Sequence, residues 1–126
     1  MSYAAHARTS YGHSNAQAIK TPRDIEYEVM ARITGRIQSH LPKPGERVSG
    51  ALAEALNENR RLWASFATDL AHPDNGLPQD LRGRLFYLAE FTMKHTAQVL
   101  LGKASAAVLA EINMAVMRGL RGQGAR

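Results

Sequence analysis

The histidines are the first residues to test for chemistry, because an imidazole can serve as a metal ligand or as a general base. The chain has five of them, His6, His13, His40, His72 and His95, and no two are three or four residues apart. Two ligands on one helix need such a spacing to reach the same metal ion. Since the chain also has no cysteine that could add a thiolate, we predict no metal site.

Catalytic motifs are missing as well. The sequence contains neither a GxxxxGK phosphate loop nor a GxSxG nucleophile turn, and these backbone shapes carry the corresponding chemistries. His95 falls on an apolar repeat, where we expect a histidine that is hydrogen-bonded inside the core. We therefore predict no enzyme activity, no cofactor and no small-molecule substrate.

A cluster of four residues suits recognition better than catalysis. Asn59, Arg60, Arg61 and Trp63 lie within five positions of one another. Tryptophan and arginine are enriched among the residues that dominate binding energy at protein interfaces. Trp63 also suits a second role, that of a large anchor in the core. We treat the four residues as a hypothetical partner-binding site.

The polar members of this cluster have structural alternatives. Asn59 interrupts an apolar repeat, so it either hydrogen-bonds a neighbouring helix, at a residue such as His95 or Asn113, or holds the backbone of a bound chain. The two arginines either contact a partner or form a solvated face with Glu54 and Glu58 as helical neighbours. Both alternatives stay open at the level of sequence.

Two methionines near the C-terminus complete the hypothetical site. Met114 and Met117 lie on the last predicted helix, and flexible thioethers adapt to varied apolar surfaces. They either line an adaptable partner groove or pack within the core.

Apolar spacing defines the elements that must position these residues. Four segments repeat large apolar residues at intervals of three and four, which is typical of amphipathic helices. We predict helices over residues 22–41, 50–70, 78–101 and 105–122. In the second of them, a seam of nearly three heptads runs through Leu52, Leu56, Asn59, Trp63, Phe66 and Leu70.

Capping and turn residues support these helix boundaries. Thr21 and Pro22 form a helix start, Ser49 is a second N-cap, and Gly102 suits the left-handed residue that ends a helix. Asn75 and Gly76 predict a turn with positive φ. In the third helix we expect Phe86 and Phe91 to widen the apolar face. The seam of that helix consists of Leu81, Leu85, Leu88, Thr92, His95 and Val99.

These elements predict an all-α protein, a single antiparallel bundle of about four helices. We assign residues 21–122 to the bundle domain and residues 123–126 to a frayed tail. We expect residues 1–20 to form a short, partly helical N-terminal segment, and whether it docks on the bundle or on a partner is left open.

The charge distribution argues against nucleic acid as a partner. The net charge is +5, yet residues 21–102 carry equal numbers of acids and bases, so the excess lies at the two ends. A nucleic-acid surface normally shows a basic stripe on an ordered element. No stretch has the roughly 20 apolar residues of a membrane-spanning helix, and we expect no membrane insertion.

Several of these segments together resemble the flagellar protein FlaF family. The strings that carry the resemblance are TPRDIEYE at 21–28, LNENRRLW at 56–63, PDNGLP at 73–78, FTMKHT at 91–96 and EINMAVMRGL at 111–120. Their order and spacing cover nearly the whole chain. Residues 42–48 fit no pattern of the family.

The resemblance implies a non-enzymatic regulator of flagellum biogenesis and motility that resides in the cytoplasm. It implies an export chaperone that binds flagellin, with FlbT as its functional partner. Two alternatives remain: an RNA-directed regulator of flagellin expression, and an adaptor that binds FlbT only. The resemblance assigns no residue-level site.

Overall fold

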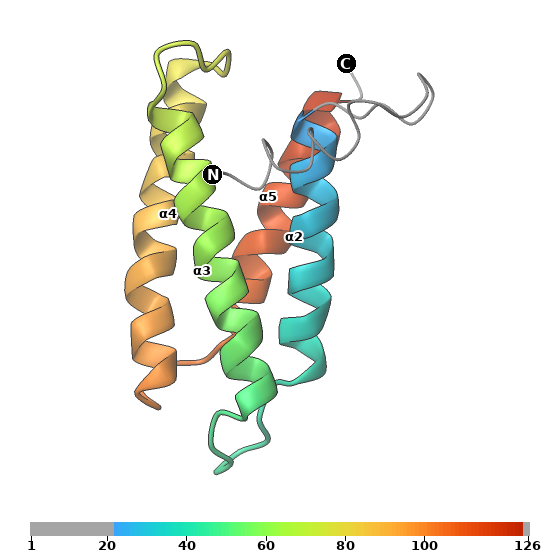
Figure 1. Cartoon of the computed structure of the whole chain (residues 1–126), viewed down its shortest axis with the longest axis vertical. Coiled ribbons are helices and arrows are strands. Elements are labelled where there is room, and N and C mark those ends of the chain that lie inside the picture. The colour runs from blue at the N-terminus through green and yellow to red at the C-terminus, as the bar shows by residue number, and fades with distance from the viewer. Residues whose placement is uncertain (1–21, 125–126) are drawn as a thin grey trace.

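The computed structural model describes residues 22–124, with side chains from Tyr27 to Gly119. Four helices make up this part of the chain: α2 (Pro22–Ser39), α3 (Gly50–Ala71), α4 (Gln79–Leu100) and α5 (Ala107–Gly124). They run alternately up and down (Figure 1), so the predicted all-α antiparallel bundle is confirmed. The predicted turns of residues 1–20 and the cap at Thr21 lie outside the described residues.

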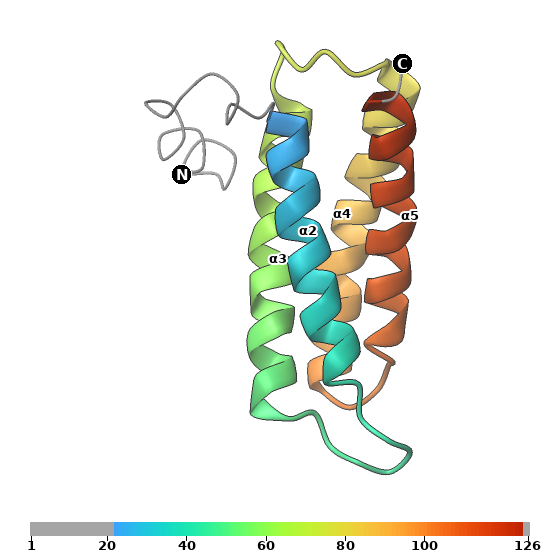
Figure 2. The same ribbon diagram turned by 90° about the vertical axis from the view of Figure 1, so that its right-hand side faces the viewer.

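The four helices do not pack equally. α3 packs closely on α4, and α2 packs closely on α5. The contact between α2 and α3 joins these two pairs, whereas α4 touches α5 only a little. Figure 2 shows α2 alongside α3 and α5, with α4 behind them. None of the helices in residues 22–124 has the length and apolar character needed to cross a bilayer.

The core lies where the apolar repeats predict it on α3. All six seam positions from Leu52 to Leu70 are buried. On α4 the prediction is partly wrong: Leu81, Leu88 and His95 are only half-buried, and Phe86 is 41% exposed. α4 packs mainly on α3 and touches α5 little, so fewer of its positions are covered than on α3.

The helix ends follow the predicted caps with small shifts. Ser49 accepts a hydrogen bond from the Leu52 N–H at 3.0 Å, and Gly102 has the predicted positive φ, +78°. α2 ends before Leu41, and α5 runs past Gly122 to Gly124. The assignment of residues 123–126 to a frayed tail is untested beyond that point, because 125–126 lie outside the described residues.

The α3–α4 turn forms differently from the prediction. Among the described residues only Gly45 and Gly102 have positive φ, so the left-handed turn expected at Gly76 is wrong. Side chains hold this turn instead. Asn75 donates to the Asp69 carbonyl at 3.0 Å and accepts from the Leu77 N–H at 3.0 Å. The Asn75 side-chain amide therefore holds the turn without a residue in the left-handed conformation.

Candidate partner-binding site

A buried polar cluster connects three helices at the level of the predicted site. The Trp63 indole N–H on α3 donates to the Asn113 side-chain oxygen on α5 at 2.9 Å. The Asn113 amide nitrogen in turn donates to Asn59 at 2.8 Å and to Thr34 of α2 at 3.1 Å. The Thr34 hydroxyl donates to the Met30 carbonyl at 2.7 Å. Asn113 is therefore the centre of a polar layer inside the apolar core.

Two of the predicted site residues belong to this layer. Asn59 and Trp63 are both 0% exposed, because the indole and the amide fill space at the centre of the bundle. The structural alternative for Asn59, a bond to Asn113, is confirmed. A partner that docks on the folded bundle does not touch either side chain, so any influence on binding acts through the packing of α3.

The two arginines lie on the surface of α3. Arg60 donates to the Asn57 side-chain oxygen at 2.8 Å. Both arginines are exposed, as either alternative requires, but neither pairs with Glu54 or Glu58, because those two acids pair with arginines of α2.

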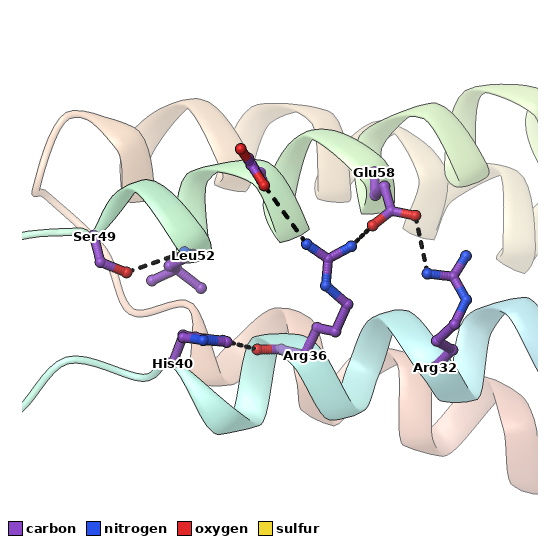
Figure 3. A network of polar contacts seen from close by, with 7 residues as sticks. Arg32, Arg36, His40, Ser49, Leu52 and Glu58 are labelled. Carbon is purple, nitrogen blue, oxygen red and sulfur yellow. Dashed lines mark hydrogen bonds and ion pairs between the residues drawn. The ribbon is translucent and has the colours of Figure 1, made fainter.

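Those acids pair with α2 instead (Figure 3). Glu58 bonds Arg36 and lies 3.2 Å from Arg32, and Glu54 lies 3.9 Å from Arg36. These ion pairs bridge the α2–α3 contact. They also leave Arg60 and Arg61 without a carboxylate partner among the described residues.

The structure places the two methionines of the hypothetical site at different depths. Met117 is 9% exposed and belongs to the core. Met114 is half-buried, and its sulfur accepts from the Gln38 amide of α2 at 3.5 Å. Met117 therefore packs within the core, Met114 contacts α2, and neither lines the cavity described below.

His95 has the satisfied hydrogen bond that was expected, at a different depth. Its Nε2 lies 2.8 Å from the Ser105 carbonyl oxygen, and its ring stacks on Phe91 with centroids 5.2 Å apart. The side chain is half-buried beside α5 rather than in the core. Among residues 22–124 no three histidine or acidic side chains come together as metal ligands.

One surface feature escaped the sequence patterns. A cavity of about 870 Å³ opens at the end of the bundle, between the α2–α3 loop and the α4–α5 connection. Its lining includes Leu41 and Val48 from the first segment and Leu100, Leu101 and Ala104 from the second. The sequence signal that could have indicated this cavity is a large apolar residue just beyond the end of a helix, at Leu41 and at Leu101.

The class that these features define is a small helical bundle with a polar layer sealed in its core and exposed arginines on its surface. The model of the flagellar protein FlaF family matches residues 7–120, nearly the whole chain. The chain belongs to this family, which confirms the resemblance seen in the sequence. No curated protein and no solved structure matches it significantly.

Proposed function

We propose that this protein is a flagellin-binding export chaperone that acts in the cytoplasm, with FlbT as its functional partner. The observation that carries the proposal is membership of the flagellar protein FlaF family over residues 7–120. The chaperone would hold a terminal, amphipathic segment of flagellin apart from other copies until export. Chaperone that has released its flagellin, or that finds no flagellin, would then signal to the translation of flagellin.

The exposed arginines support a protein partner. Arg60 and Arg61 contribute no buried surface to the core, and Glu54 and Glu58 are occupied by arginines of α2. Guanidinium groups that have no carboxylate partner can form charge-assisted hydrogen bonds with carboxylates of a bound helix. An amphipathic helix commonly docks through anchors at intervals of three and four residues.

The test is a calorimetric titration of the purified full chain against purified monomeric flagellin. We expect a saturable complex, and we expect flagellin to aggregate less in its presence. The matched control is flagellin shortened at both ends, which lacks the terminal segments and should not bind. Failure of intact flagellin to bind would refute the chaperone role.

Two further titrations separate the alternatives. Binding to FlbT without binding to flagellin would identify an adaptor. An RNA regulator would bind the flagellin messenger RNA leader selectively and at submicromolar concentration. We expect only weak RNA binding that disappears at moderate salt, because a neutral centre offers few simultaneous phosphate contacts.

A further inference from the structure

The end cavity collects most of the exposed large apolar side chains of the described residues. Five such residues are exposed, and three of them, Leu41 (38%), Leu100 (39%) and Leu101 (65%), line this cavity. The other two, Phe86 and Tyr87, lie on α4 away from it. A hollow lined by clustered apolar side chains marks a binding surface more strongly than the same residues scattered singly.

The two segments that supply the lining, residues 41–48 and 99–107, carry a net positive charge, and we call them the rim of the cavity. Arg47 lines the cavity, and Lys43 and Lys103 directly follow the lining residues Pro42 and Gly102. The one acid in the lining, Glu46, accepts a hydrogen bond from the Lys43 N–H at 2.7 Å. Three bases of the rim therefore stand against this one carboxylate, which leaves the rim with a positive net charge.

Two helix dipoles reinforce this positive charge. α3 and α5 both begin at this end of the bundle (Figure 1), and neither has an acidic residue in its first turn. A helix N-terminus favours a nearby anion. The combination of an apolar floor, a basic rim and two positive helix ends selects for ligands that are apolar and anionic together.

We propose that this end pocket binds a peptide segment of another protein in which apolar side chains stand next to carboxylates. The apolar side chains would cover Leu101 and its neighbours, and the carboxylates would face Arg47 and Lys103. The inference goes beyond the proposed function, because it defines a second surface, remote from Arg60 and Arg61 along the sequence, and the chemistry of what covers it.

Charge disfavours the two occupants that the chain itself could supply. Residues 1–20 contain Arg8 and Lys20 and no acidic residue, so this segment would place cations against a basic rim. A second copy joined by a two-fold axis would oppose the same basic pocket to itself. A separate, acidic chain meets neither repulsion.

The first test uses selection from a randomised peptide display library on the immobilised full chain. We expect enrichment of sequences with Asp or Glu beside Leu, Ile or Phe. A Leu101→Glu variant should lose at least about tenfold in affinity for a selected peptide, or about 1.4 kcal/mol. A double Arg47→Glu, Lys103→Glu variant should lose as much affinity, because two carboxylates would then repel the carboxylates of the peptide.

The matched control is Tyr87→Glu. Tyr87 and Leu101 are both 65% exposed, so either change adds one carboxylate to an open surface and should leave the melting temperature nearly unchanged. Only Leu101→Glu should weaken the peptide. Enrichment of basic or uncharged sequences, or equal binding by both variants, would overturn the proposal.

Two measurements decide whether the chain covers its own pocket. Light scattering on wild type and Leu101→Glu should give the same mass; a dimer that Leu101→Glu dissociates would assign the pocket to a second copy. Removal of residues 1–20 should leave peptide affinity unchanged. A large gain in affinity would assign the pocket to that segment and refute the proposal. None of these arms uses flagellin, so their failure would leave the chaperone hypothesis intact.

Discussion

Asn113 illustrates how one buried amide can organise a bundle core. Its oxygen accepts from Trp63, and its nitrogen donates to Asn59 and Thr34. A buried polar group without a partner costs more than a hydrogen bond gains. Helix registers that separate these four side chains therefore carry a penalty, and the polar layer favours the one register in which they meet.

The residue scale supplies a paired prediction. We expect Asn113→Ala to cost about 2–4 kcal/mol of unfolding free energy, because Trp63, Asn59 and Thr34 all lose a partner. Asn59→Ala should cost about 1 kcal/mol, since its amide nitrogen already lacks a partner and Asn113 keeps two others. Urea unfolding measures both. Equal costs, or a larger cost for Asn59→Ala, would contradict the central role of Asn113.

Two glycines of the α4 region make a second pair. Gly102 has φ +78°, so Gly102→Ala should lose about 1–2 kcal/mol through left-handed strain. Gly83 lies within α4, and a Cβ built there meets nothing within 4 Å. Gly83→Ala should gain about 0.5–1 kcal/mol. Thermal melting distinguishes the signs, and a gain in stability for Gly102→Ala would refute the left-handed cap.

At the scale of the helices, α3 and α4 differ in how fully they are covered. α3 packs on both α2 and α4, whereas α4 packs well only on α3. The α3 seam is therefore buried at every position, while α4 leaves Phe86 exposed and Leu81 and Leu88 half-buried. One close neighbour covers a smaller part of a helix surface than two close neighbours do.

This difference predicts which truncations matter. Leu56→Ala on α3 and Leu85→Ala on α4 should each cost about 2–5 kcal/mol, because the two side chains are 0% and 6% exposed. Phe86→Ala removes a larger side chain next to Leu85 and should cost less than about 1 kcal/mol. Chemical denaturation ranks the three variants. Costs below about 1 kcal/mol at both leucines would contradict the assigned core.

For the whole molecule, the central question is which charges stabilise the fold and which serve recognition. Arg32 and Arg36 bridge α2 to α3 through Glu58, so they belong to the framework. Arg60 and Arg61 are exposed and bridge no two helices in the described residues. Similar side chains therefore have different roles according to the helix face on which they lie.

The corresponding test combines stability with binding. A double Arg60→Ala, Arg61→Ala variant should melt within a few degrees of wild type, since exposed charges contribute about 0–1 kcal/mol. Under the chaperone hypothesis it should bind flagellin or FlbT at least about tenfold more weakly. The control is Arg84→Ala, Arg118→Ala, which removes the same charge from exposed positions of α4 and α5 and should bind normally. Unchanged capture by both variants would refute the Arg60–Arg61 site.

The sequence by itself determined the four helices, most of their ends and the α3 core. These features depend on contacts between near neighbours: apolar side chains at intervals of three and four, the Ser49 cap and the glycine at 102. The resemblance to the family could also be found without coordinates, because it rests on the order and spacing of short strings along the chain.

Only the tertiary structure decided how the helices share their side chains. Asn59 had several candidate partners, and the packing of α5 against α2 selected Asn113. Glu58 could pair along its own helix, but α2 brought Arg32 and Arg36 closer. The end pocket joins residues near 45 to residues near 102. Each outcome depends on side chains that are distant in sequence, and a periodic pattern on one helix carries no information about which neighbour will face it.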